Sequence, residues 1–441
     1  MIGNAFNSIG VAAIVLGIII VIHELGHFLV AKFFKIKVET FSVGFGPRLI
    51  GFRKGDTDYR LSAFPLGGYV KMAGETPMDT ITGEAYEFLS KPKWQRFLVA
   101  AAGPAMNVIL AVGLIMGLYV YGTDVPEFLI GQAVINVVEP GSPAEKAGIR
   151  PGDAIVALDG KEKPDWQDVQ NTILTSPGRR LAIAIDRAGK RLDLTVTPER
   201  KGREEAGDAG WFPVIRTLVQ DVRPNTPAEA AGVKAGDEII RVNGVDLRTS
   251  GRLLQPTIQQ MTEATFPITV LRAGKEVEIQ VTPMTDKGRK MIGIDIQYPS
   301  IHIKLGVVDA FKKSVQSNID NAALIFQVIG RLLRREASLK QLDGPVGIVA
   351  VSGQAYQAGF GTLLTFMALI SLNLGVLNIL PIPILDGGVI LLLIIEALMG
   401  RDLSLRMKER IVQASFVFLL MLTVIVLYND VVKLLPPTQA P

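Results

Sequence analysis

The most prominent pattern in the chain is a set of long apolar runs separated by charged and glycine-rich stretches. Four runs are long enough to span a bilayer, and they cover residues 8–33, 97–121, 361–400 and 411–428. Hydrophobic residues make up 49% of the 441 residues and the mean hydropathy is +0.34, which is too apolar for an ordinary soluble enzyme. We therefore expect a polytopic α-helical membrane protein with four transmembrane segments.

The third apolar run is too long for one simple span. Pro381 and Pro383 lie near its middle, and a proline inside a helix removes a backbone donor and clashes with the preceding turn. We expect the helix to break there and to free backbone groups within the membrane-spanning segment.

Basic residues flank the apolar runs unevenly and predict the orientation of the chain. Eleven Lys and Arg residues lie from Lys32 to Arg96, and four more lie between residues 401 and 410. By the positive-inside rule both segments are cytoplasmic, so both termini and the large region 122–360 lie outside the cytoplasm. The N-terminus lacks the basic region and cleavage site of a signal peptide, and the first helix is expected to stay attached.

Residues 38–72 read as short β-type runs interrupted by glycine turns. Val38, Phe41, Val43 and Phe45 are more apolar than a solvated loop requires. We expect a small β-sheet that dips into the protein near the first span, because non-helical backbone at membrane depth must be buried or line a water-filled cavity. A cytoplasmic β-hairpin that only packs against its neighbours remains the alternative.

The extramembrane region contains an internal repeat with a constant offset of 84 residues. Residues 138–160 (VEPGSPAEKAGIRPGDAIVALDG) match residues 222–244 (VRPNTPAEAAGVKAGDEIIRVNG). Each copy predicts a strand, a short helix starting at a Ser-Pro or Thr-Pro pair, a Gly-Asp turn, a second strand and a tight hairpin. Beyond the repeats, Val307 to Arg335 predicts an amphipathic helix on the outer membrane surface.

Composition narrows the possible chemistry. The chain has 46 Lys+Arg against 42 Asp+Glu, and its basic residues lie beside apolar runs without the aromatic interleaving of nucleic-acid surfaces. We expect a lipid bilayer as partner and no nucleic acid. There is no cysteine, so any metal must be held by histidines and carboxylates, and there are only three histidines. His302 lies in a predicted strand or linker near the second repeat and is expected to be a surface histidine.

The sequence HELGH lies inside the first apolar run, where ionisable residues are costly and need a function. Residues four apart share a helix face, so His23 and His27 can bind one zinc ion while Glu24 lies beside a water at the metal. This arrangement predicts a hydrolytic site. The alternative is a chance HExxH on a solvated helix, which the apolar flanks disfavour.

Asp386 is the ionisable residue of the apolar segment SLNLGVLNILPIPILDGG, directly after the predicted helix break. Two histidines leave zinc short of ligands, and Asp386 completes a two-His, one-carboxylate site with an open position for water. The alternative is that Asp386 is the N-cap of the helix that follows the break.

Together these motifs resemble the site-2 protease family of intramembrane zinc metalloproteases, in particular its bacterial group with two PDZ domains. The resemblance covers essentially the whole chain. It includes HELGH in the first span, GFGP in the following loop, GPAMN in the second span, the tandem repeat, and NLGVLNILPIPILDGG in the third. One departure is Val389, where family members often have histidine, at a position that is not a metal ligand.

The resemblance implies roles for several residues of these motifs. His23, His27 and Asp386 bind Zn²⁺, and Glu24 is the catalytic base. The residues implied to hold the substrate in extended form are Asn378, Asn373, Pro381, Pro383, Gly44 and Gly46. The glycines belong to a membrane-reentrant β-element that receives a substrate strand.

The resemblance and the apolar pattern divide the chain into segments. The expected PDZ domains cover 125–205 and 210–290, and the remaining segments are 1–34, 35–96, 97–121, 300–358, 359–400 and 411–430. The PDZ pair is expected to act as a size filter outside the cytoplasm, or alternatively as a plug or spacer, because a fold does not establish ligand binding.

The implied function is cleavage of the transmembrane segment of a single-pass protein in the bacterial inner membrane. The expected substrate is an anti-sigma factor whose outer domain another protease has trimmed, in an envelope stress response, together with remnant signal peptides. Two other functions compete. One is a non-catalytic PDZ membrane scaffold with a structural metal, and the other is a metal transporter, for which the spans carry too few polar residues.

Overall fold

The computed structural model describes residues 2–75, 82–202, 205–213, 216–248, 254–286, 289–297, 299–334 and 344–434. The chain forms two compact units. The helical unit contains residues 1–123, 304–330 and 342–441, and the β-rich unit contains residues 124–303 and 331–341.

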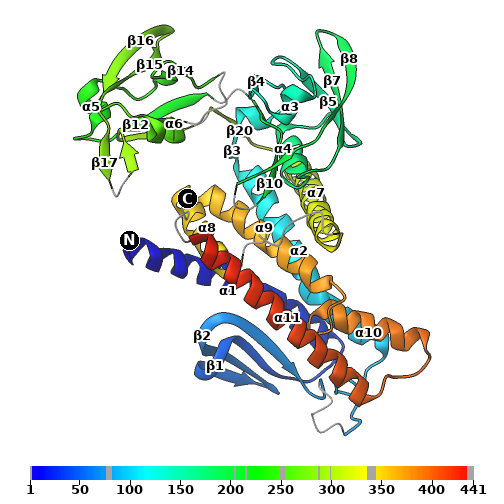
Figure 1. Ribbon diagram of the computed structural model, residues 1–441. Helices are drawn as coiled ribbons and strands as arrows, with labels where there is room; N and C mark the ends of the chain where they lie inside the picture. Colours follow the sequence, from blue (N-terminus) through cyan, green and yellow to red (C-terminus); the bar gives the residue numbers. More distant parts are fainter. Residues whose placement is uncertain are drawn as a thin grey trace. The chain divides into compact units, whose positions relative to one another are not determined.

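Long helices dominate the helical unit (Figure 1). They are α1 (Ile2–Phe33), α2 (Lys93–Tyr121), α7 (Val307–Leu333), α8 (Pro345–Gln357), α9 (Phe360–Ile379), α10 (Asp386–Leu398) and α11 (Leu405–Leu434). Four of these, α1, α2, α9 and α11, are long and apolar enough to cross a membrane, in agreement with the four predicted spans.

Small residues allow α1 and α2 to approach closely. A Cβ atom on Gly26 of α1 would lie 2.3 Å from the carbonyl oxygen of Ala102 on α2, so only glycine fits at this crossing. A Cβ atom on Gly103 would lie 2.3 Å from Nε2 of His27. The two helices therefore pack backbone against backbone at the level of the HELGH motif.

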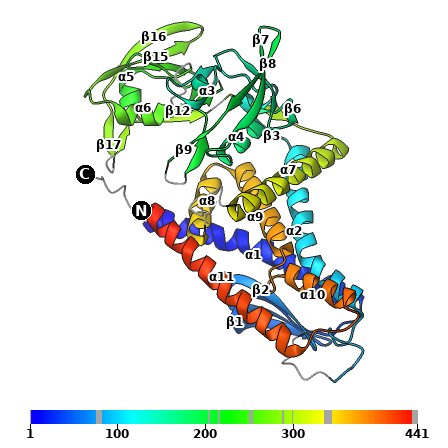
Figure 2. The same ribbon diagram turned by 45° about the vertical axis from the view of Figure 1, so that its right-hand side comes forward.

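The predicted break in the third apolar run is confirmed. Helix α9 ends at Ile379 and α10 begins at Asp386, so the segment forms two helices joined by a turn (Figure 2). The turn is closed by backbone hydrogen bonds such as Leu385 N to Ile382 O (2.8 Å). Gly387 and Gly388 pack against the turn, where a Cβ atom on either would lie 2.1–2.2 Å from backbone atoms.

The helical unit also contains a β-sheet formed by β1 (Val38–Lys54) and β2 (Thr57–Met72), which lies beside α1 (Figure 1). The expectation of short runs was wrong, because these strands are 17 and 16 residues long. Gly44 and Gly46 have φ near +89° and bend β1 without ending it. The first half of β1 therefore lies between two parts of β2, since Val43 opposes both Gly68 and Leu61. The second half of β1 pairs with β2 from Arg48, which opposes Ser62.

Asp430 connects α11 to α8. The helix α8 begins after Gly344, which has no side chain to cap it. The buried carboxylate of Asp430 accepts hydrogen bonds from the backbone N–H groups of Gly344 (2.9 Å), Val346 (3.0 Å) and Gly347 (3.3 Å). An acidic group at a helix N-terminus is favourable, so this contact anchors the end of an otherwise exposed helix.

Helix α7 is amphipathic, as predicted. It buries Ala310, Ser314 and Asn318, and Ser314 Oγ donates to the carbonyl oxygen of Val112 on α2 (2.6 Å). Phe311 and Phe326 are exposed. The prediction extended the helix to Arg335, which lies outside the described residues.

The β-rich unit contains the two copies of the sequence repeat, each with the predicted order of elements. The first copy comprises β4 (Val137–Val138), α3 (Pro143–Lys146), β5 (Ala154–Leu158), β6 (Lys161–Glu162), α4 (Trp166–Leu174), β7 (Leu181–Arg187) and β8 (Lys190–Val196). The second comprises β12 (Thr217–Val222), α5 (Pro227–Ala231), β13 (Glu238–Val242), β14 (Val245–Asp246), α6 (Leu254–Gln260), β15 (Phe266–Arg272) and β16 (Lys275–Val281).

Each repeat has its own hydrophobic core. The first core gathers residues from Ala133 to Trp211, and the second gathers residues from Val219 to Ile292. The strand order is β6-β5-β7-β8 in the first sheet and β16-β15-β13-β12-β19 in the second, with β14 paired to β13. Separate cores indicate two structural bodies of the same design.

Short elements complete the β-rich unit. They are β3 (Thr123–Pro126), η1 (Glu127–Leu129), β9 (Glu199–Lys201), β10 (Ala206–Asp208), β11 (Trp211–Phe212), β17 (Met284–Asp286), β18 (Arg289–Met291), β19 (Ile294–Gln297) and β20 (Ser300–Ile303). Strand β20 pairs with β3. His302 on β20 lies 2.9 Å from Asp124 and its side chain is 60% exposed, so it is the expected surface histidine.

Candidate metal centre and active site

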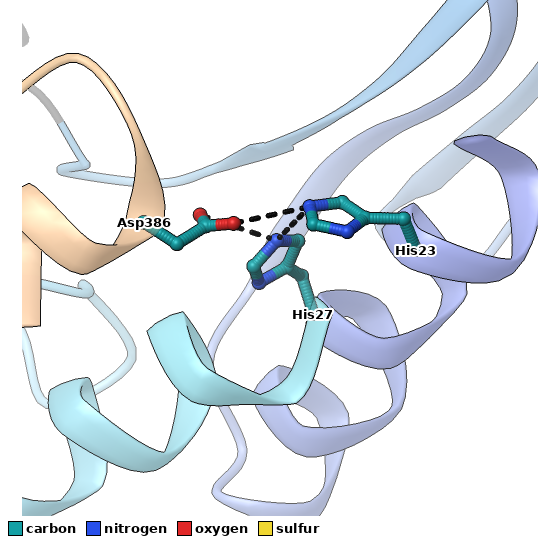
Figure 3. Close-up of side chains that lie close together, drawn as sticks. All are labelled: His23, His27 and Asp386. Carbon is teal, nitrogen blue, oxygen red and sulfur yellow. Dashed lines mark hydrogen bonds and ion pairs between the residues drawn. The ribbon is translucent and has the colours of Figure 1, made fainter. Parts of the chain in front are cut away.

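Three potential ligands converge inside the helical unit. His23 and His27 lie one turn apart on α1. Asp386 is the first residue of α10, directly after the break between α9 and α10, and its side chain points toward both rings (Figure 3). The two Nε2 atoms are 3.2 Å apart. Asp386 Oδ2 lies 3.1 Å from His23 Nε2, and Oδ1 lies 3.4 Å from His27 Nε2.

These separations fit a tetrahedral zinc site. Metal–ligand distances of about 2.0–2.1 Å give ligand–ligand distances of about 3.3 Å in a tetrahedron. The three measured separations lie between 3.1 and 3.4 Å. Among the described residues, this is the one group of His, Asp and Glu side chains close enough to share a metal ion.

The N-cap alternative for Asp386 is not observed. The residue at the N-cap position of α10 is Leu385, and no side chain caps the helix. The Asp386 carboxylate faces imidazoles instead of backbone amides, as a metal ligand does.

Helix α2 contacts the outer edge of both imidazole rings. His27 Nδ1 lies 2.8 Å from the carbonyl oxygen of Val99, and His23 Nδ1 lies 3.1 Å from Nδ2 of Asn107. Asn378 of α9 reaches the inner edge, with Nδ2 3.4 Å from His23 Nε2. His23 is therefore held from two sides, by α2 and α9, and His27 is held by α2.

A cavity of about 610 Å³ opens onto the three residues. Its walls are mostly apolar and include Val70, Met72, Phe88, Leu89, Leu392 and Leu393. Arg96, Glu396 and Lys408 also line it, and Lys408 pairs with Glu396 at 2.6 Å. A mainly apolar cavity that leads to a few convergent polar groups is typical of a substrate site.

Glu24 lines the same cavity, next to the ligand pair and facing β2. A backbone hydrogen bond links Glu24 to Val70. A Cβ atom on Gly68 would lie 3.5 Å from Glu24 Cγ, so this part of β2 passes directly over the glutamate. Residues 68–72 pair with β1 on one side and form one edge of the folded sheet.

The other predicted substrate-binding residues lie at varying positions around the cavity. Pro383 and Val389 line the cavity, whereas Pro381 is exposed on the turn and is not part of the wall. Asn373 has a buried Oδ1 without a hydrogen-bond partner among the described residues. Gly44 and Gly46 pack against Phe64 at the bend of β1, away from the cavity lining.

The sequence did not identify several residues that shape the site. Val99 acts through its carbonyl oxygen, so its residue type carried no signal. Gly103 acts by having no side chain, and its place in the GPAMN motif did not show that it lies against the histidines. Gly68 and Val70 act through the backbone of β2. Asn107 carried a signal, as a polar residue in an apolar span, but its partner could not be inferred.

Comparison with known proteins identifies the family of the chain. The sequence matches peptidase family M50 over residues 11–422. The chain belongs to peptidase family M50. It is 32% identical to the regulator of sigma E protease of Haemophilus influenzae, an alignment that covers 97% of this chain and 99% of the relative.

Other relatives of this M50 peptidase cover similar lengths. The regulator of sigma-E protease RseP of Salmonella typhimurium is 31% identical, and RseP of Escherichia coli is 29% identical. Each alignment covers 96% of this chain and 97% of the relative. A Vibrio cholerae relative, 30% identical over 96% of this chain and 97% of its own length, has a name that includes the words zinc metalloprotease.

This M50 peptidase is an intramembrane zinc metalloprotease and a multi-pass protein of the inner membrane. The donor set described above fits the zinc of the family.

Proposed function

We propose that His23, His27 and Asp386 hold the catalytic zinc and that Glu24 is the general base. The mutual distances of 3.1–3.4 Å among the three ligand groups are the observation that carries this assignment. When bound, zinc supplies a Lewis acid that polarises the peptide carbonyl and lowers the pKa of a coordinated water.

Glu24 moves the proton in this proposal. Its carboxylate takes a proton from the attacking water as the oxygen bonds to the peptide carbon. When the peptide C–N bond breaks, Glu24 returns that proton to the leaving nitrogen. The surrounding apolar walls exclude other water and strengthen these electrostatic contacts.

The substrate enters as an extended strand. A transmembrane helix hides its peptide groups in hydrogen bonds, so it must unwind locally before cleavage. The edge formed by residues 68–72 lies beside Glu24 and offers backbone groups that satisfy the unwound segment. Asn378, Asn373 and the turn with Pro381 and Pro383 hold the other side of the strand, while Gly44 and Gly46 shape the sheet.

The β-sheet lies partly in the membrane. Apolar side chains on its outer half are strongly exposed, including Ile50 (72%), Phe52 (62%) and Phe64 (62%). Exposed apolar side chains of this size are suited to lipid rather than water.

The natural substrate is a single-pass protein of the anti-sigma type, trimmed first by another protease, in envelope stress signalling. Remnant signal peptides are a second class. The names of the sigma-E regulator relatives support this assignment. The two repeats are PDZ domains of the permuted bacterial type, and they act outside the cytoplasm as a filter that rejects untrimmed substrates.

The direct test uses a tagged single-pass anti-sigma-type substrate without its outer domain, with detergent-solubilised wild type and Glu24→Gln. Wild type should cut within the span, while the variant should keep one zinc per chain and lose turnover by about 10²–10⁴-fold. Equal cleavage by both proteins would overturn the role of Glu24. A substrate that retains a folded outer domain should be cut more slowly, and equal rates would overturn the filter.

Orientation has a separate test, because the chain contains no cysteine. Asp193→Cys, on an exposed strand of the first repeat, should react with a membrane-impermeant maleimide in intact spheroplasts. Lys54→Cys, at the tip of the β1–β2 hairpin, should react only after permeabilisation. The reverse pattern would place the repeats in the cytoplasm.

A further inference from the structure

Helix α2 supplies no metal ligand, yet one of its faces lies against both histidines. Val99, Gly103 and Asn107 are spaced by four residues and therefore lie on one side of the helix. Val99 contacts His27, Asn107 contacts His23, and Gly103 leaves the space that both rings occupy. This face sets the orientation of the two ligands.

The main chain fixes the protonation of His27. A carbonyl oxygen can only accept a hydrogen bond, so His27 Nδ1 must donate to Val99 O across the 2.8 Å contact. A neutral imidazole with its proton on Nδ1 presents a lone pair on Nε2, the atom that faces Asp386.

His23 is held by a side chain instead. Asn107 is fully buried (0% exposed), and its amide lies 3.1 Å from His23 Nδ1. Its Oδ1 has no hydrogen-bond partner among the described residues, although a buried acceptor is costly to leave unpaired. The two ends of an amide have nearly the same shape, so Asn107 can present either Nδ2 or Oδ1 to the ring.

We propose that Asn107 is a positioning residue for the metal: its Oδ1 accepts the Nδ1–H of His23 and thereby keeps Nε2 free to bind zinc. The proposal rests on the assignment of His23 as a ligand. With Oδ1 turned toward His23, the acceptor gains the Nδ1–H donor, and Nδ2 takes the place in which Oδ1 has no partner. Both histidines then have the same tautomer, one fixed by main chain and the other by Asn107.

The surroundings keep the Asn107 backbone in place. Ser371 of α9 is fully buried, and its hydroxyl donates to the carbonyl oxygen of Asn107 (2.8 Å). A Cβ atom on Gly375 would lie 3.3 Å from Asn107 Cβ, so α9 packs closely against this residue. Since α9 leads into the turn before Asp386, the same helix positions Asn107 and the third ligand.

The test measures zinc affinity of the full-length, detergent-solubilised protein by competition with a chelator. Asn107→Leu and Asn107→Ala lack the acceptor and should bind zinc about 10–100-fold more weakly than wild type. Asn107→Asp keeps an acceptor for Nδ1–H and should bind within a few-fold of wild type. The visible absorption of the cobalt-substituted protein should change in the Leu and Ala variants and be retained in the Asp variant.

Ser314→Ala is the matched control, because it removes a buried hydrogen bond to the backbone of the same helix, at Val112 O, without touching Asn107 or His23. It should lower thermal stability while zinc affinity stays within about threefold of wild type, well below the effect expected at Asn107. Wild-type affinity in both Asn107→Ala and Asn107→Leu would overturn the proposal, as would equal losses in these variants and in Ser314→Ala.

His23→Ala separates this proposal from the ligand assignment on which it rests. Loss of zinc in His23→Ala together with full affinity in the Asn107 variants rejects only the positioning role. Retention of zinc in His23→Ala rejects the ligand set itself.

Discussion

One buried aspartate in each repeat of the β-rich unit and the aspartate of the metal site in the helical unit have opposite kinds of partner. In the β-rich unit, Asp153 and Asp237 are each 1% exposed and each receives two hydrogen bonds of 2.7–2.8 Å from an arginine of the same repeat. In the helical unit, Asp386 faces two imidazoles and pairs with no Lys or Arg among the described residues. A carboxylate that is paired with an arginine stabilises the fold. A carboxylate that faces imidazole rings, without a Lys or Arg partner, is suited to bind a metal ion.

The repeat itself supports this distinction. The partners Arg187 and Arg272 occupy equivalent strands, β7 and β15, and each also donates to a backbone carbonyl of its own repeat. Asp153 accepts from Arg150 N (2.7 Å), and Asp237 accepts from Lys234 N (2.9 Å). An Asp–Arg pair that has the same contacts in both copies stabilises the fold of the repeat.

The largest effect should come from filling the space beside the histidines. A Cβ atom on Gly103 would lie 2.3 Å from His27 Nε2 and 2.7 Å from His23 Nε2, so Gly103→Ala must displace the ligands. Proteolysis should fall by about 100-fold or more, since a displacement of about 1 Å at a reacting centre has that effect. Turnover of the span-only substrate and zinc content measure it.

Gly113→Ala is the control on the same helix, because nothing lies within 4 Å of the added methyl group. It should leave turnover unchanged. Full activity and zinc content in Gly103→Ala would mean that the rings are not confined by α2.

The next largest effect should be structural and confined to the β-rich unit. Asp153→Asn removes the charged acceptor of Arg187, and the first repeat should lose about 2 kcal/mol of stability while zinc content is unchanged. Trp166 and Trp211 are buried in that core and report its unfolding by fluorescence. Exposed Asp193→Asn serves as control, and a loss of zinc in Asp153→Asn would contradict the distinction between the repeat aspartates and the metal-site aspartate.

Acidification should weaken the β-rich unit through the same pair of aspartates. Burial alone would raise the pKa of Asp153 and of Asp237, but hydrogen bonds from Arg187 and Arg272 and from backbone amides outweigh it and lower both pKa values. The stabilisation is fully present above the unfolded-state pKa of about 3.9 and is lost as the pH falls through the lower folded-state pKa.

Melting curves followed by tryptophan fluorescence should therefore decline below about pH 4, and not between pH 5 and 8. Asp153→Asn should flatten that decline for the first repeat. An unchanged slope in the variant would assign the acid sensitivity to other groups.

The smallest effect is expected at the third histidine. His302→Ala removes an exposed contact with Asp124, and surface substitutions of this kind change stability by no more than about 0.5 kcal/mol. Zinc content and turnover should equal those of wild type. A fall in zinc per chain would add His302 to the metal chemistry.

Much of the helical unit followed from the sequence because its signals are local. Apolar runs of spanning length gave the four long helices, and Pro381 with Pro383 gave the break before Asp386. The position of the β1–β2 sheet near the first span was predicted, but the length of its strands was not. Positive-φ glycines such as Gly44 bend a strand as readily as they end it, and the sequence does not distinguish these outcomes.

The candidate site was predictable in its side chains but not in its supporting contacts. HELGH and the aspartate after the break named the residues whose chemistry is distinctive. Val99, Gly103 and residues 68–70 act through main chain or through an absent side chain, and they lie far from the histidines in sequence. Only the folded packing of α2 and β2 against α1 reveals them.

The order of the elements along the chain has a consequence for biosynthesis. His23 and His27 lie on α1, which precedes the β-rich unit in the chain, whereas Asp386 follows that unit. The whole β-rich unit is synthesised between them. A growing chain therefore carries only two of the three proposed zinc ligands while the β-rich unit is synthesised. A peptidase that cuts membrane segments becomes competent only after that unit has been made and Asp386 has followed it.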